Sequence, residues 1–191
     1  MTTEKIREME DTLLRFGGTY ILNHAKRVLY ISRLIAEKEN IICNEEILTF
    51  VSFFHDISAF PPYRPEGIFD HAFESSKIVP SIAKEYGFSE KDIEIIIEAV
   101  KFHDKVGMGE HNETRLIRNA DGLDYLGFMA VARDFSKQPN DMKKAIDTLK
   151  KRKEQFYSII DYDYAKEIAA PRLDELDTFI NKFIEESFGL Y

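Results

Sequence analysis

The stretch NEEILTFVSFFHDIS (44–58) decides the fold of this chain, because it is an apolar run that ends in histidine and aspartate. Asn44 followed by two glutamates is typical of a helix N-cap with acids in the first turn. The apolar positions after it keep helical spacing up to His55. We therefore predict a buried helix that ends near Ser58 and presents His55 and Asp56 at its end.

Helical spacing continues on both sides of this stretch. Residues 20–36 place Ile21, His24 and Val28 on one apolar face, and Asp121 shares such a face with Leu116 further along the chain. Between these helices, FPPYRPEG (60–67) predicts a substrate-facing loop, since three prolines and a glycine disfavour a regular element. No strand alternation, βαβ rhythm or internal repeat is visible.

The fold class that follows is all-α. We predict a single helical bundle over residues 1–191. Its core spans about residues 20–130 and holds the histidines, and C-terminal helices at 141–188 pack on it.

Composition and charge exclude several classes of function. A formal charge of −8 opposes binding to a nucleic acid polymer, so an anionic substrate would have to be small and neutralised locally, which points to a metal. The single cysteine, Cys43, matches a reducing compartment, and no segment reads as a leader or a membrane span. We expect a cytoplasmic protein without membrane partners.

Four side chains make up the predicted metal site: His24, His55, Asp56 and Asp121. Buried without a cation, the two carboxylates would be desolvated close to each other, and a divalent metal removes that conflict. Two imidazoles and two carboxylates suit Mn²⁺, Fe²⁺, Co²⁺, Mg²⁺ or Zn²⁺. We expect one ion, with room for a second.

The order of these residues resembles the H…HD…D signature of the HD superfamily of metal-dependent phosphohydrolases. The resemblance covers nearly the whole chain and follows the layout of short bacterial HD-domain nucleotide pyrophosphohydrolase-like proteins. It rests on the segments HAKRV (24–28), FFHDIS (53–58), DHAFESSKI (70–78), AVKFHD (99–104), RNADGLDYLGFMAVARDF (118–135) and AKEIAAPRLDELDTFI (165–180).

The resemblance implies a single HD domain and a metal-dependent hydrolase. Its substrate would be a phosphoester or phosphoanhydride of a small nucleotide-like molecule, attacked by a metal-activated water. Two residues depart from the pattern. Gly122 stands where a basic residue often follows the last metal-binding aspartate, and Asn119 stands where an acid is common.

Other residues receive candidate roles near this site. His71 and His103 either bind a second metal with Asp56 bridging, contact substrate phosphate, or are structural. Glu74 lies three residues after His71 on the same helix face and either orients the attacking water or is a solvated acid. The candidates for binding substrate phosphate are basic residues near the predicted site: Arg27, Lys105, Arg118, and also Arg64 and Lys101.

Two other functions remain open at this point. Some HD-fold relatives with a longer H…HD…H…H…D set are di-iron oxygenases, and a non-catalytic nucleotide-binding sensor would keep the same pocket. The residues also leave open the specific substrate and its pathway, the physiological metal and whether one or two ions bind. The oligomeric state, a homodimer included, is open as well.

Overall fold

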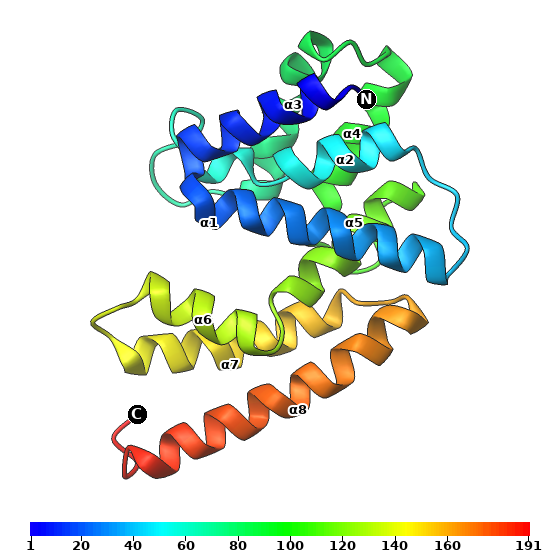
Figure 1. Cartoon of the computed structure of the whole chain (residues 1–191). Helices are drawn as coiled ribbons and strands as arrows, with labels where there is room; N and C mark the ends of the chain where they lie inside the picture. Colours follow the sequence, from blue (N-terminus) through cyan, green and yellow to red (C-terminus); the bar gives the residue numbers. More distant parts are fainter.

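The computed structural model describes residues 1–191 and contains helices and no strands, which confirms the all-α prediction (Figure 1). None of the helices is both long enough and apolar enough to cross a lipid bilayer. The elements in chain order are α1 (Thr3–Lys38), α2 (Glu45–Phe54), the 3-10 helix η1 (Ile57–Ala59), α3 (His71–Glu85), α4 (Glu90–Phe102), α5 (Asn112–Asp124), α6 (Phe128–Lys137), α7 (Met142–Ser158) and α8 (Asp163–Glu186).

The helices form two groups that meet at α5. Helices α1 to α5 pack on one another in the upper part of Figure 1, and α6 to α8 pack on one another below them. Helix α5 contacts α1, α2 and α4 on one side and α7 and α8 on the other. Apart from Arg115, every residue of α5 from Glu113 onward is buried, so this helix has almost no face toward solvent.

The end of α2 differs from the prediction in a way that matters for the site. Asn44 caps α2 as expected, since its side chain accepts hydrogen bonds from the backbone of Glu46 and Ile47. The helix ends at Phe54, however, and not near Ser58. Asp56 lies between α2 and η1 with φ −104° and ψ 18°, outside helical geometry. This break frees Asp56 from the angle of about 100° that separates neighbouring side chains on a helix.

Helix α1 also begins earlier than predicted. No helix is predicted before residue 20, where charged residues dominate, yet α1 starts at Thr3 and buries Met9 and Leu13. It is broken once, at Gly18, whose φ of 66° and ψ of −173° suit glycine best. The break turns the second half, which carries His24, toward the core.

Asn119 and Gly122 hold α5 against the junction between α7 and α8. Asn119 is fully buried, donates to the Asp161 carboxylate at 2.7 Å and accepts from the backbone N–H of Asp161 and Tyr162. A Cβ at position 122 would lie 3.0 Å from the carbonyl oxygen of Phe156. The two departures from the family pattern therefore serve the packing of the C-terminal helices.

Replacing Asn119 with aspartate is expected to destabilise the fold by about 2 kcal/mol, because a buried carboxylate would lose both donors and face the Asp161 carboxylate. Urea denaturation would measure the loss. Asp163→Asn, at an exposed position near the start of α8, is the matched control and should stay within about 0.5 kcal/mol of the parent protein. An unchanged midpoint for Asn119→Asp would contradict this account of position 119.

Candidate metal centre

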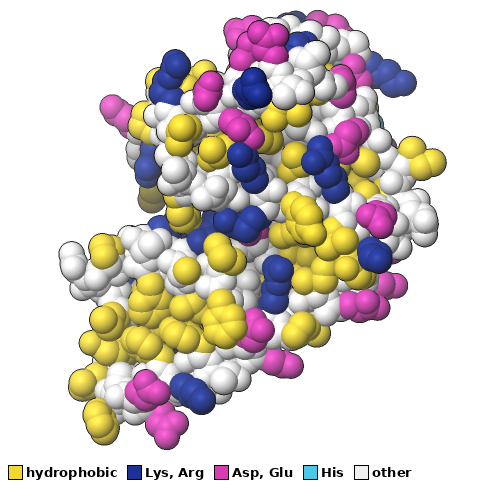
Figure 2. Space-filling view, viewed as in Figure 1, with side chains coloured by type: hydrophobic (Ala, Val, Ile, Leu, Met, Phe, Trp, Pro, Cys, Tyr) yellow, Lys and Arg dark blue, Asp and Glu magenta, His cyan; other side chains and the backbone are white.

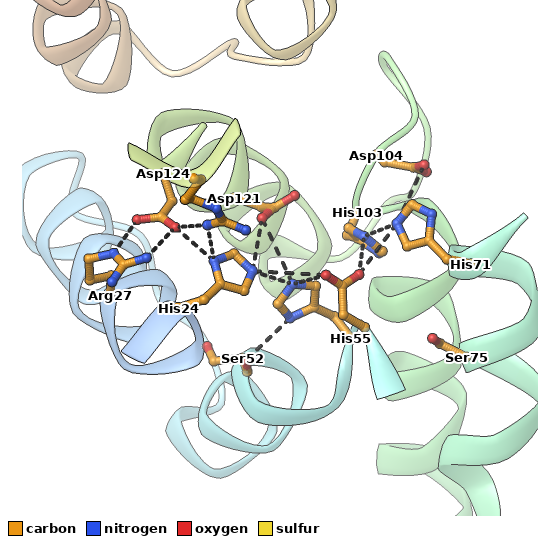
Figure 3. A network of polar contacts seen from close by, with 12 residues as sticks. His24, Arg27, Ser52, His55, His71, Ser75, His103, Asp104, Asp121 and Asp124 are labelled. Atoms are coloured by element: carbon orange, nitrogen blue, oxygen red, sulfur yellow. Dashed lines mark hydrogen bonds and ion pairs between the residues drawn. The ribbon is translucent and has the colours of Figure 1, made fainter. Parts of the chain in front are cut away.

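The first cluster of ligand atoms joins α1, the end of α2 and α5. His24 Nε2 lies 3.2 Å from His55 Nε2 and 3.4 Å from Asp121 Oδ1. Figure 3 shows these three side chains pointing toward one another. All three are buried. Asp56 Oδ2 approaches the same point, 3.7 Å from His55 Nε2 and 4.0 Å from His24 Nε2. The structure thus brings together the four residues predicted as metal ligands.

The histidines are oriented by hydrogen bonds on their far side. Nδ1 of His24 lies 2.8 Å from Asp124 Oδ2, and Nδ1 of His55 lies 3.1 Å from the carbonyl oxygen of Ser52. The carboxylate and the carbonyl are acceptors, which favours the ring proton on Nδ1 and the lone pair of Nε2 toward the centre. Arg133 Nη1, a donor, also lies 2.8 Å from His24 Nδ1, but it pairs with the same Asp124 oxygen. Two lone pairs 3.2 Å apart repel each other unless a cation lies between them.

The second cluster lies on the other side of Asp56. Asp56 Oδ1 is 3.4 Å from His71 Nε2 and 3.5 Å from His103 Nε2. These two nitrogens are 3.2 Å apart, and Nδ1 of His103 faces the carbonyl oxygen of Val100 at 2.7 Å. Asp104 Oδ2, 4.0 Å from His71 Nε2, adds a carboxylate to which the sequence assigned no role. Asp56 therefore faces one cluster with each of its oxygens.

Two observations indicate that the ligand atoms of both clusters suit divalent cations. Bond lengths of about 2.1 Å put neighbouring ligand atoms about 3.0 Å apart in an octahedron and about 3.4 Å apart in a tetrahedron. The shortest distances within each cluster, 3.2 to 3.4 Å, lie in that range, and the longest reach 4.0 Å. Asp56 Oδ1 and Asp121 Oδ1 are buried without a hydrogen-bond partner, although buried carboxylate oxygens are normally paired. A cation in each cluster would supply the missing interaction.

Burial shifts the ionisation of His24, His55 and Asp121 toward their neutral forms. It lowers the pKa of His24, and it lowers the pKa of His55 to about 4. It raises the pKa of the Asp121 carboxyl. Burial alone would also raise the pKa of Asp56, but the neighbouring histidines hold it well below its usual value. The imidazoles of His24 and His55 are therefore neutral near pH 7, as metal ligands must be, and the Asp121 carboxylate depends on a nearby cation for its charge. Burial would lower the pKa of His103 in the second cluster as well, but the Asp56 carboxylate raises it to about 9.

Asp124 supports His24 from behind. Its carboxylate accepts hydrogen bonds from His24 and from Arg27 Nε at 2.5 Å, and it pairs with the buried Arg133. Burial alone would raise the pKa of Asp124, but the hydrogen bonds from His24 and Arg27 outweigh it and hold that pKa at about 2. Arg27 thus reaches a neighbouring acid and not the substrate cavity. Arg133, on α6, was not identified from the sequence.

Replacing Asp124 with asparagine is expected to weaken metal binding about 10- to 100-fold, because the amide cannot hold the His24 ring as the carboxylate does. Competition with a fluorescent chelator would measure the affinity. Arg27→Gln leaves the bond between His24 and Asp124 in place and should change the affinity less than about threefold. Equal losses in the two variants would show that charge, and not ring orientation, controls the site.

A cavity of about 680 Å³ opens onto the carboxylates of the centre. Asp56, Asp121, Asp104 and His71 form one side of it. The other lining residues are Tyr20, Ile21, Ala59, Phe60, Arg64, Phe69, Tyr125, Arg133, Lys137, Arg152, Gln155 and Phe156. The predicted loop at 60–67 thus contributes Phe60 and Arg64, and α6 and α7 supply most of the basic residues.

Besides Arg27, four residues proposed for catalysis or substrate binding do not line the cavity. Lys101 lies over the ring of Phe102, 5.1 Å from its centroid. Arg118 is buried and bound to Asp161 at 2.9 Å and to the carbonyl of Met108, and it does not line the cavity. Glu74 pairs with Lys77 at 2.6 Å and does not line the cavity. Lys105 pairs with Asp70 and Asp104 beside the second cluster without lining the cavity.

The chain is similar in sequence and structure to known proteins. A family model described as HD domain matches residues 21–126. An HD-superfamily hydrolase from Bacillus thuringiensis is 20% identical, with 96% of each chain covered and a TM-score of 0.68. Bacillus subtilis YpgQ is 19% identical, with 96% of this chain and 94% of that chain covered and a TM-score of 0.71.

A further crystal structure of Bacillus subtilis YpgQ, in complex with ADP, is 18% identical. It covers 95% of this chain and 97% of that chain, with a TM-score of 0.69. At these identities the neighbours show a shared fold over almost the whole chain. Among functionally curated proteins, no sequence matches this one.

Proposed function

This chain belongs to the HD domain family, and from that premise we propose that it is a phosphohydrolase of small nucleotide-like phosphoesters or phosphoanhydrides. The fold supports a metal-dependent phosphohydrolase in general. The observation that carries the proposal is Asp56, which faces His24 and His55 with one oxygen and His71 and His103 with the other at the floor of a cavity. This geometry suits one ion bound by His24, His55, Asp56 and Asp121, and a second bound by Asp56, His71 and His103.

Divalent ions in these clusters would acidify a water molecule and offset charge on a phosphoryl oxygen. The side chains of the protein would hold the ions in place and determine which groups a substrate can contact. The imidazoles of His24, His55 and His103 are buried behind the carboxylates, so they fix the centre without touching substrate. The His71 side chain is 40% exposed and lines the cavity, which makes it the histidine that a bound phosphoryl group would reach.

The rest of the cavity supports a nucleotide-like substrate. Phe60, Phe69 and Phe156 give it aromatic surface against which a base or a sugar could pack. Lys137 and Arg152 also line the cavity and give it positive charge. The crystal structure of YpgQ in complex with ADP supports a nucleotide ligand for this fold.

The test is a hydrolysis screen of the purified protein loaded separately with Mn²⁺, Co²⁺, Fe²⁺, Mg²⁺ or Zn²⁺. The substrates are nucleoside mono-, di- and triphosphates, dinucleoside polyphosphates and cyclic dinucleotides. Release of phosphate, pyrophosphate or nucleotide that stops with chelator is the expected result. Failure to turn over any of these with any metal would contradict the proposed function.

The pair of clusters bridged by Asp56 also favours a second candidate, a di-iron oxygenase. Iron-loaded protein would then consume O₂ in the presence of a substrate and show a mixed-valence EPR signal. Such a result without phosphate release would replace the hydrolase assignment. Tight nucleotide binding without any product would instead indicate a sensor.

A further inference from the structure

Tyr125 lies between the metal centre and the cavity. It follows Asp124 at the end of α5 and lines the cavity together with Asp56 and Asp121. Its ring meets the ring of His24 edge to face, with the centroids 5.9 Å apart, and Nε2 of His24 belongs to the first cluster. The side chain of Tyr125 is therefore beside the predicted ligands and within reach of a molecule that enters the cavity.

Both faces of the Tyr125 ring are covered. Phe156 lies parallel to it, with 4° between the planes and 4.0 Å between the centroids. The guanidinium carbon of Arg133 is 3.9 Å from the same centroid, and two groups this close to one centroid must lie on opposite faces. A base or a sugar therefore has no free face of Tyr125 to stack on. The ring edge and the hydroxyl are what this side chain offers to a ligand.

The hydroxyl of Tyr125 is not used by the protein. The Tyr20 hydroxyl accepts a hydrogen bond from Arg133 Nε at 2.9 Å, whereas the Tyr125 hydroxyl has no such partner. The buried polar atoms that lack a partner include the hydroxyl of Tyr162 but not that of Tyr125, so the Tyr125 hydroxyl is accessible from the cavity. Burial raises the pKa of Tyr125 well above its usual value, although the charge of Arg133 opposes the effect. The hydroxyl is thus protonated near pH 7 and can donate a hydrogen bond.

The arginines that line the cavity are partly committed to acids. Figure 2 shows Lys and Arg side chains gathered in the hollow between the two groups of helices. Arg133 is bound to Asp124, however, and Arg152 pairs with the buried Asp134. An anionic ligand gains less from a cation that an acid already neutralises. A free hydrogen-bond donor near the metal centre is therefore of value to such a ligand.

A neutral donor also suits a site whose floor is made of carboxylates. A further lysine or arginine beside Asp56 and Asp121 would pair with them and compete with a divalent ion. A hydroxyl carries no charge and does not compete. The contacts with Phe156 and Arg133 hold the Tyr125 ring in place, so its hydroxyl needs no ordering when a ligand arrives.

We propose that the Tyr125 hydroxyl binds substrate by donating a hydrogen bond to a non-bridging oxygen of the phosphoryl group held above Asp56 and Asp121. The proton stays on Tyr125, and the hydroxyl takes part in no covalent step. The position of the phosphoryl group rests on the proposed function. The role of Tyr125 rests on its covered ring faces and its unpaired hydroxyl.

The test is Tyr125→Phe, which removes the hydroxyl and keeps the ring between Phe156 and Arg133. Binding of methylphosphonate, whose P–C bond resists hydrolysis, is measured by calorimetry in a fixed excess of Mg²⁺. The variant should bind this probe about tenfold more weakly, because a hydrogen bond to a charged group is lost. The kcat/KM for a substrate found by the hydrolysis screen should fall about 10- to 100-fold for the same reason.

Two further measurements separate substrate binding from a structural role. The melting temperature of Tyr125→Phe should stay within about 2 °C of the parent value, since the stacked ring remains. Its affinity for Mn²⁺, measured by competition with a fluorescent chelator, should equal that of the parent protein. Tyr157→Phe is the matched control, because Tyr157 is 44% exposed on α7 and does not line the cavity. This control should bind both methylphosphonate and metal as the parent does.

The outcomes distinguish the role of Tyr125 from the proposed function. If the parent protein binds methylphosphonate and Tyr125→Phe binds it equally well, the role of Tyr125 is wrong and the proposed function stands. A parallel loss of Mn²⁺ affinity would show that the hydroxyl serves the metal centre, which also overturns its role toward substrate. If the parent binds no methylphosphonate with metal present, the phosphoryl site of the proposed function is wrong as well.

Discussion

Replacing Asp56 with alanine is expected to lower phosphohydrolase turnover by about 10³-fold or more, equivalent to about 4 kcal/mol of transition-state stabilisation. Asp56 has one carboxylate oxygen toward each cluster, so its loss removes a ligand from each. The first cluster would keep His24, His55 and Asp121. The second would keep only His71 and His103, with Asp104 near His71. Steady-state kinetics and metal analysis would measure the two effects.

Two comparisons make this result specific. Asp11→Ala, an exposed acid on α1, should retain parent turnover, and circular dichroism should show equal helix content in both variants. Replacing His71 and His103 together should leave about one metal per chain with sharply reduced turnover, because the first cluster is untouched. An Asp56→Ala protein with full metal content and full activity would disprove the bridging role. Loss of all metal in the double histidine variant would show that the clusters are assigned wrongly.

Removing the metal is expected to lower the melting temperature by about 10 °C. A ligand present at about 1,000 times its Kd stabilises the folded state by about 4 kcal/mol. For a domain of this size, each kcal/mol shifts the midpoint by about 2–4 °C. The effect is large here because one carboxylate oxygen of Asp56 and one of Asp121, Oδ1 in each, are buried without a hydrogen-bond partner. Differential scanning calorimetry with and without EDTA would measure it.

The control is the same experiment on the Asp56→Ala variant, which should respond less to EDTA because it holds less metal. Adding Mn²⁺ back to the parent protein should restore the midpoint. A melting temperature that stays the same after confirmed metal loss would count against a buried metal centre in this protein.

The sequence predicts which helix faces carry the four metal ligands, but not how all of them are placed. His24 and Asp121 lie on helices whose apolar spacing identifies the inner face, and His55 ends an apolar helix. Their convergence follows from packing these helices together. The two-sided placement of Asp56 could not be predicted, because it depends on the break between α2 and η1 that sets its backbone angles.

The sequence could not predict which arginine lies at the metal centre. Arg118 and Arg133 both lie on helices beside apolar residues, and nothing local tells them apart. Arg118 meets Asp161, which lies beyond α7, and Arg133 folds back on Asp124 across the turn at Gly127. Gly127 adopts φ 71°, and this turn sets the direction of α6. The contact between Arg133 and Asp124 therefore depends on the turn between α5 and α6, which helical periodicity in the sequence does not predict.

Helix α5 has a consequence for how this protein can evolve. Most helices here have one face in water, where substitutions are tolerated, but α5 is buried almost all round between the two groups of helices. It carries Asp121 and Asp124 on one side and packs Gly122 against α7 on the other. A change that suits the C-terminal helices must therefore also suit the ligands. We therefore expect that exchanging the last three helices with those of a relative would disturb α5 and, with it, the metal ligands.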